Sequence, residues 1–263
     1  MKKSSIIHHP SSITLNIPTK VGIFDSGAGG LTVVKSLMEH GLFDEIVYYG
    51  DTARVPYGTK DPATITRYAL EALEFFKNFD IDLLVTACNS VSAHAIPELR
   101  ANAGFPVYGV IEPGILALEN AGLPHSSRIL VLGTRATVGS GRYQRGIKEL
   151  GFENLQALSP SLFVPLVEEG IFEGAILKST LDYYFKEIPS PDAIILGCTH
   201  FPLIADAIRD YFPNRPLLIH SGEAIAQHLE RNGCKPGITE ETKLTIFASE
   251  NPDALKQIAK KWL

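Results

Sequence analysis

Two stretches of the sequence decide the fold: DLLVTAC at residues 82–88 and DAIILGC at residues 192–198. Each stretch starts with an aspartate, continues as a short apolar run and ends with a cysteine six positions after the aspartate. Short runs of this composition are typical of strands buried on both faces of a parallel sheet. The recurrence therefore predicts an internal repeat that places Cys88 and Cys198 at matching strand ends.

Other segments match in the same order and at nearly the same spacing. The pairs are KVGIF at 20–24 with RILVL at 128–132, Val55-Pro56 with Val164-Pro165, and PVYGV at 106–110 with PLLIH at 216–220. A single match between two apolar strands can arise by chance, because Val, Leu and Ile replace one another in such strands. Matches that recur in order predict two similar halves, related by a pseudo-twofold axis.

Short aliphatic runs alternate with helical patterns along the chain. The runs lie at 21–25, 45–50, 82–88, 106–111, 128–133, 193–198, 216–220 and 243–247. This alternation is typical of parallel sheets covered by helices on both faces. We therefore expect an α/β protein of two similar domains, each a mainly parallel sheet flanked by helices.

The composition of the 263 residues is that of a folded globular protein, with 45% hydrophobic and 20% charged residues. The net charge is −5 and no basic cluster runs along the chain, which disfavours nucleic acid or a membrane surface as a partner and favours a small molecule. The segment 1–20 is rich in Ser, Pro and Ile without periodicity, so we expect an N-terminal extension in which His8 and His9 are solvated. It contains no apolar export signal, which predicts a cytosolic protein.

The cysteines fit this setting as thiols, because three in a chain of this length do not form a disulfide framework. Ligands of parallel sheets bind beyond the carboxyl ends of the strands, where Cys88 and Cys198 are expected. Either one alone could be a small buried hydrophobe. Two at matching positions, each opening a helix whose N-terminus would lower the thiol pKa, indicate functional thiols. Cys234 lacks such a setting and is expected in a loop.

Several chemistries use two thiols. A redox pair usually lies close in sequence as C-x-x-C, and a metal site needs more ligands than the one adjacent histidine, His200. Inversion of a stereocentre fits better, because a proton leaves one face of a carbon and another arrives on the opposite face. The sequence therefore favours a racemase and predicts no metal.

Polar groups surround both thiols in the sequence. The turn Asp25-Ser-Gly-Ala-Gly-Gly lets backbone N–H groups approach a ligand, although Thr32 breaks the dinucleotide-binding G-x-G-x-x-G pattern. The turn at 54–59 (RVPYGT) offers backbone donors and a phenol to a carboxylate. The neutral donors, each of which could equally be a helix cap, are Asn89, Ser90, Thr134, Thr137 and Thr199. His200 can relay a proton or serve as a structural histidine.

A series of motifs resembles the glutamate racemase family in order from Val21 onward. They are FDSGAGGLTV (24–33), YYGDTARVPYG (48–58), TACNS (86–90), GVIEPG (109–114), GTRATVGS (133–140), LFVPLVEEG (162–170) and LGCTHFPLI (196–204). Ser90 stands where the family usually has threonine, and the hydroxyl is retained.

The resemblance implies cofactor-independent interconversion of L- and D-glutamate by a cytoplasmic homodimer that supplies D-glutamate for peptidoglycan. It implies that Cys88 acts on the D-enantiomer and Cys198 on the L-enantiomer, assisted by Asp25, His200 and Glu168. The substrate contacts that it implies are Asp25, Ser26, Pro56, Tyr57, Gly58, Asn89, Ser90, Thr199 and His200. It also implies a first domain of residues 21–110 plus 223–263, a second domain of residues 111–222, and an active site between them.

Three other readings remain open at this point. Racemases with two cysteines that act on aspartate or another acidic amino acid share this architecture. A two-lobed amino-acid binding protein would close similar halves on a ligand, although it needs no paired thiols. A redox or metal protein is a more distant alternative.

Overall fold

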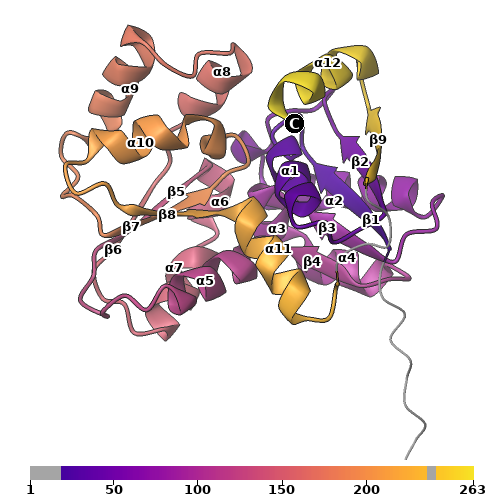
Figure 1. Ribbon diagram of the computed structural model, residues 1–263, viewed down its shortest axis with the longest axis horizontal. Helices are drawn as coiled ribbons and strands as arrows, with labels where there is room; N and C mark the ends of the chain where they lie inside the picture. Colours follow the sequence, from indigo (N-terminus) through magenta and orange to yellow (C-terminus); the bar gives the residue numbers. More distant parts are fainter. Residues whose placement is uncertain (1–18, 236–240) are drawn as a thin grey trace, which may run out of the picture.

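The computed structural model describes residues 19–235 and 241–263. The expected extension, with His8 and His9, lies outside the described residues except for Thr19 and Lys20. Two parallel sheets lie side by side, each covered by helices (Figure 1). The predicted α/β class with two similar halves is confirmed.

The first sheet has five strands in the order β4-β3-β1-β2-β9, and each neighbouring pair is parallel. Its strands are β1 (Lys20–Asp25), β2 (Glu45–Gly50), β3 (Leu83–Thr86), β4 (Val107–Gly109) and β9 (Lys243–Ala248). The C-terminal strand β9 thus extends the edge formed by β2.

The second sheet has four parallel strands in the order β6-β5-β7-β8. They are β5 (Ile129–Gly133), β6 (Leu155–Leu158), β7 (Ala193–Gly197) and β8 (Leu217–His220). Strand for strand, this is the order of β1 to β4 in the first sheet. The aspartates of the repeat also have equivalent roles: Asp82 accepts 2.8 Å bonds from the N–H groups of Thr19 and Lys20, and Asp192 accepts a 2.7 Å bond from that of Arg128.

Strand periodicity explains the helical layers of the first half, because alternate residues of each strand face opposite sides. Val21, Ile23 and Leu83 pack on one side, and Phe24 and Leu84 on the other. The first side is covered by α1 (Leu31–Glu39), α11 (Ser221–Arg231) and α12 (Pro252–Trp262), and the other by α2 (Pro62–Phe76), α3 (Asn89–His94) and α4 (Ile96–Asn102).

The second half repeats this pattern. Leu130 and Leu132 of β5 pack on one side, and Ile129 and Val131 pack on the other. The first side is covered by α8 (Phe163–Glu168), α9 (Ala175–Phe185) and α10 (Ala205–Tyr211), and the second by α5 (Ile111–Asn120) and α7 (Arg142–Glu149). The short α6 (Arg135–Gly139) follows β5 directly.

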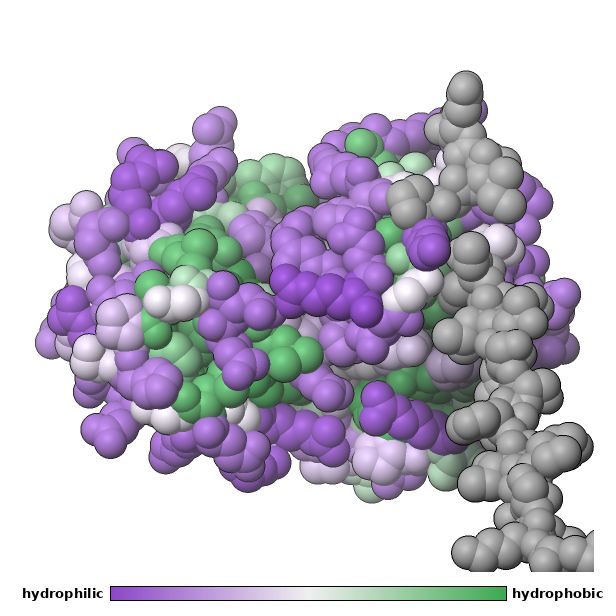
Figure 2. Space-filling model, turned by 60° about the horizontal axis from the view of Figure 1, so that its bottom comes forward, coloured by the Kyte–Doolittle hydropathy of each residue, from purple (hydrophilic) through white to green (hydrophobic). Residues whose placement is uncertain are grey.

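Helix α11 joins the two halves. It follows β8 of the second sheet, contacts α5 of that half and packs on α1 of the first half, where Ile225 and Leu229 enter the core (Figure 1). On the face shown in Figure 2, hydrophilic side chains predominate and hydrophobic ones show mainly over the half that contains β5 to β8. Within the described residues, no helix is long and apolar enough to cross a membrane.

The structure corrects some strand boundaries. The run at 106–111 is a strand only at Val107–Gly109, because α5 has begun at Ile111. The run at 82–88 pairs only from Leu83 to Thr86, so Cys88 lies two residues beyond the strand. The edge strand β6 was not predicted from the sequence.

Candidate active site

Cys88 and Cys198 line the same small cavity, of about 20 Å³, between the two halves. The cavity lies beyond the carboxyl ends of β1, β3, β5 and β7, as expected for parallel sheets. Its lining residues come from both halves and are Ser26, Val55, Pro56, Tyr57, Gly58, Cys88, Asn89, Ser90, Thr134, Val164, Cys198, Thr199 and His200. Predicted residues that are distant in sequence are therefore brought together. Asp25 and Glu168 do not line the cavity, but they contact the lining residues Thr199 and His200, respectively.

Cys88 is the N-cap residue of α3 and is 6% exposed. Its thiol donates a hydrogen bond to Ser26 Oγ at 3.7 Å. Burial, reinforced by the negative charge of Asp25, raises the pKa of Cys88 to about 12. The expectation that a helix N-terminus lowers this pKa is therefore wrong for Cys88, because desolvation outweighs the backbone N–H groups of so short a helix.

Asp25 ends β1 and is fully buried. Its carboxylate accepts a 3.0 Å bond from the backbone N–H of Gly27 and a 3.3 Å bond from the hydroxyl of Thr199 in the other half. Burial nevertheless raises the pKa of Asp25, against the opposing effect of the charge on His200. A buried carboxyl with a raised pKa next to a thiol can hold a transferred proton.

Cys198 has a different neighbour. Its Sγ lies 3.8 Å from Nδ1 of His200, whose Nε2 lies 3.2 Å from Oε1 of Glu168. Burial by itself lowers the pKa of His200, but the interactions with Cys198 and Glu168 outweigh it and raise the pKa to about 10. His200 therefore carries a proton at neutral pH, next to one thiol.

The glycine turn after β1 brings the two halves into contact. A Cβ atom at Gly29 would collide with the Thr199 hydroxyl and the His200 ring, so only glycine permits this approach. The hydroxyl of Thr32 donates a 3.0 Å bond to the carbonyl of Thr199. The turn thus fixes Asp25 next to the segment that follows Cys198.

Hydroxyl groups connect the halves on another side of the cavity. Ser90 Oγ lies 2.8 Å from Thr134 Oγ1, which also caps α6 by accepting a bond from the N–H of Thr137. Thr134 therefore both lines the cavity and caps a helix, whereas Thr137 lies behind it.

The turn at 54–58 contributes Val55, Pro56, Tyr57 and Gly58 to the cavity. The sequence predicts that this phenol donates to a carboxylate of a ligand. In the structure, the hydroxyl of Tyr57 donates instead to the buried carboxylate of Asp51. Only the backbone donors of the turn remain for a ligand. Sequence analysis missed Asp51, which lies inside the quoted motif YYGDTARVPYG.

Two cavity residues, Val55 and Val164, were also missed as site residues. They are partners in the repeat at Val55-Pro56 and Val164-Pro165, which was the signal that could have identified them. Cys234 lies in a loop as predicted, but it is buried in the core, and burial raises its pKa to about 11.

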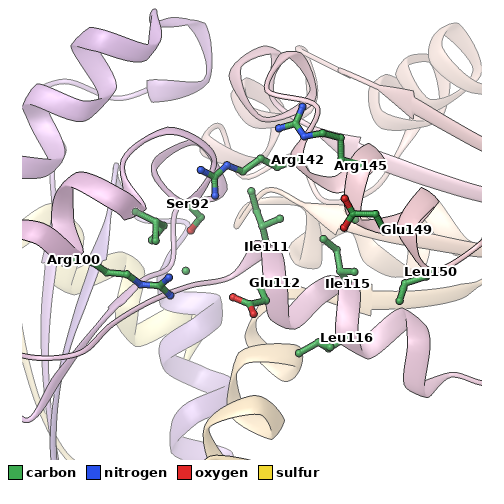
Figure 3. A pocket seen from close by; sticks show the side chains of 13 residues that line it. Ser92, Arg100, Ile111, Glu112, Ile115, Leu116, Arg142, Arg145, Glu149 and Leu150 are labelled. Carbon is green, nitrogen blue, oxygen red and sulfur yellow. The ribbon is translucent and has the colours of Figure 1, made fainter.

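The described cysteines are free thiols, and no group of three or more His, Cys, Asp or Glu residues in 19–235 and 241–263 is arranged to hold a metal ion. A larger cavity, about 490 Å³, is lined by residues of α3, α4, α5 and α7, among them Ser92, Arg100, Glu112 and Arg142 (Figure 3). Arg100, Arg142 and Arg145 line it together with Glu112 and Glu149, but its described lining contains no cysteine or histidine. The smaller cavity, which both thiols line, is therefore the candidate active site.

Comparisons with known proteins find similar sequences and similar folds. The model of the family described as Asp/Glu/Hydantoin racemase matches residues 32–229. A glutamate racemase of Nitratiruptor sp. is 65% identical, with 93% of this chain and 96% of the relative covered. The crystal structure of glutamate racemase from Campylobacter jejuni has a TM-score of 0.91 at 52% identity, covering 93% of this chain and 98% of that one. The crystal structure of glutamate racemase from Francisella tularensis in complex with D-glutamate has a TM-score of 0.83 at 29% identity, with 94% of both chains covered.

Proposed function

The chain belongs to the Asp/Glu/hydantoin racemase family, and from that membership we propose that it interconverts L- and D-glutamate without a cofactor. The observation that carries this proposal is the pair of thiols, Cys88 and Cys198, at matching positions of two similar halves and facing one cavity. Racemisation by a two-base mechanism uses one acid–base group on each face of Cα. In this proposal, the two matching thiols are these groups.

In the proposed reaction, one thiolate removes the Cα proton and becomes a thiol, while the opposite thiol protonates the carbanion and becomes a thiolate. Cys88 needs help to ionise, because its pKa is raised to about 12. We assign that help to Asp25, whose raised pKa lets it accept the proton. His200, held by Glu168, exchanges a proton with Cys198 across their 3.8 Å contact.

The substrate carboxylates are bound by neutral donors in this scheme. The side chains are those of Ser26, Asn89, Ser90 and Thr199, and the backbone of Tyr57 and Gly58 in the turn adds further N–H groups. Because Cα–H is a far weaker acid than a thiol, prearranged donors in a site without bulk water must stabilise the charge that develops on the adjacent carboxylate.

The cavity has room for little more than one water molecule. Glutamate is much larger, so the two halves, or the valines Val55 and Val164 at the cavity, must move apart for it to enter. Closure on the substrate would then exclude water. The division into residues 21–110 plus 223–263 and residues 111–222, with the site between them, suits such a movement.

We propose glutamate, not aspartate, as the substrate because relatives at 65% and 52% identity are glutamate racemases. The reaction would supply D-glutamate in the cytoplasm for peptidoglycan synthesis. The test is chiral analysis of the product after the metal-stripped protein has been incubated with L-glutamate and with L-aspartate separately. D-glutamate is the expected product, and turnover of aspartate alone would contradict the assignment.

A homodimer is also part of the proposal. Large apolar side chains are exposed along residues 162–183 of the second half, namely Leu162, Phe172, Ile176 and Tyr183. Exposed apolar groups concentrated in one segment are typical of interaction surfaces. Light scattering on a size-exclusion column should give twice the mass of one chain, and Ile176→Glu should shift the mass toward the monomer.

A further inference from the structure

A buried chain of hydrogen bonds ends at a cavity residue, Asn89. The hydroxyl of Tyr143 donates to Asn89 Oδ1 at 2.8 Å, and Asn89 Nδ2 donates to Ser221 Oγ at 3.3 Å. Ser221 in turn donates to the backbone carbonyl of Leu196 at 3.1 Å. Tyr143, Asn89 and Ser221 are each at most 3% exposed. The bonds therefore form out of contact with bulk water.

The direction of every bond in this chain follows from its last acceptor. A carbonyl only accepts, so Ser221 donates to Leu196, and its Oγ accepts from Asn89 while it also lies next to the Tyr143 hydroxyl. The group of Asn89 that faces Ser221 is therefore its NH₂, and the group that faces Tyr143 is its oxygen. Burial also raises the pKa of Tyr143, so the phenol keeps its proton and remains the donor.

The phenol of Tyr143 is fixed by packing as well as by its hydrogen bond. A Cβ atom at Gly197 would contact its ring, and one at Gly114 would contact its hydroxyl, so these two glycines make room for it. Its neighbours on α7, Arg142 and Arg145, line the larger cavity (Figure 3). Tyr143 thus reaches from the second half to Asn89 in the first.

An asparagine amide has two N–H donors and one oxygen acceptor. In Asn89 the oxygen is used by Tyr143 and one N–H by Ser221, which leaves the second N–H for the cavity that Asn89 lines. We propose that Tyr143 and Ser221 are positioning residues, which hold the Asn89 amide so that an N–H, and not the oxygen, meets a carboxylate of the substrate. This inference rests on the proposed function.

The chain also connects the two thiol segments. Asn89 directly follows Cys88, and Leu196 lies two residues before Cys198. The carboxylate donor is thus held in a fixed position relative to both acid–base groups. Without the Tyr143 hydroxyl, Asn89 Oδ1 loses its donor and the amide is held only from the Ser221 side, so its N–H is aimed less firmly at the substrate carboxylate.

The test is Tyr143→Phe, which removes one hydroxyl and keeps the ring. We expect KM for both enantiomers to rise about tenfold, with a smaller loss in kcat, because a ground-state contact to the substrate is weakened. The matched control is Tyr211→Phe, which removes a hydroxyl bonded to Asp182 at 3.1 Å in the same half, away from the cavity lining. The control should stay within about twofold of the parent.

A double-mutant cycle separates positioning from a general structural effect. If Tyr143 acts through Asn89, then Tyr143→Phe should change KM by less than about twofold in an Asn89→Ala background. Effects that multiply in the double variant, or an unchanged KM in Tyr143→Phe, would overturn the inference. If Tyr143→Phe proves unstable, Ser221→Ala replaces it in the cycle with Asn89→Ala. Ser221→Ala should likewise raise KM in the parent and change KM by less than about twofold in the Asn89→Ala background.

Measurements on the parent protein separate a failure of the proposed function from a failure of the positioning role of Tyr143. A parent that neither racemises nor binds glutamate overturns the proposed function and the substrate contact with it. A parent that racemises glutamate, with a Tyr143→Phe variant of unaltered KM, overturns the positioning role alone.

Discussion

Cys88 and Cys198 occupy equivalent places beyond β3 and β7, the strands that lie next to β1 and β5 in sheets of the same strand order. Their surroundings, however, differ in charge. Cys88 lies beside the buried carboxyl of Asp25, and Cys198 beside the histidine that is held by Glu168. A symmetrical pair of thiols thus has one acidic and one basic neighbour.

The first prediction concerns Glu168→Gln. The carboxylate of Glu168 contributes to the pKa of about 10 at His200, so its removal lowers that pKa. His200 then loses its proton at a lower pH, and the alkaline limb of kcat/KM should move to lower pH, with a larger loss near pH 9 than near pH 7. The pH profile measures this, with the exposed neighbour Glu169→Gln as control. An alkaline limb that stays in place would exclude His200 as the titrating group.

The second prediction concerns Asp25→Asn. Because burial raises the pKa of Asp25, an ionised Asp25 destabilises the fold, and this cost is fully present above the folded-state pKa and disappears below the ordinary value of 3.8. The variant should therefore melt at a higher temperature than the parent at pH 7, with a difference that shrinks toward pH 4. Thermal unfolding at several pH values measures this. A lower melting temperature at pH 7 would contradict it.

The same variant should lose activity by about 10²- to 10⁴-fold, the usual range for an acid–base group. The loss in kcat/KM must be equal in both directions, because the equilibrium constant between two enantiomers is 1. A stabilised and inactive Asp25→Asn protein would show that the carboxylate is retained for the reaction at a cost in stability.

The third prediction concerns solvent hydrogen. In D₂O, the product of inverted configuration should carry deuterium at Cα from the first turnover, because the incoming proton comes from the opposite thiol, which has exchanged with solvent. Mass spectrometry of the product at low conversion measures this. Product that keeps the hydrogen of the substrate would indicate a single base.

Much of the fold was predictable because the repeat pairs buried strands, whose apolar runs are unambiguous. The exception is β6, an edge strand with the sequence LQAL. Its residues are only partly buried, so they need not all be apolar and do not form a recognisable apolar run. The turn into α5 shortened a predicted strand, because an apolar run by itself does not distinguish a strand from the start of a helix.

The site was predictable where residues follow strands, as with Asp25, Cys88 and Cys198. Burial was not predictable, and it reversed the expected direction of the pKa shift at Cys88. Contacts between the halves, such as that of Tyr143 with Asn89, depend on how the two sheets are placed, which a strand pattern does not specify.

The central claim is that each thiol serves one face of Cα. Cys88→Ala and Cys198→Ala should each abolish racemisation in both directions, because one variant lacks the base for a given enantiomer and the other lacks the acid that completes its conversion. Cys234→Ala, which removes a buried thiol outside the cavity lining, should retain the activity of the parent.

The most direct measurement is the rate of racemisation by a Cys198→Ala protein that melts cooperatively near the parent temperature and still binds glutamate. The two-thiol account predicts no measurable racemisation from either enantiomer. A folded, glutamate-binding Cys198→Ala protein that racemised within a few-fold of the parent rate would contradict it.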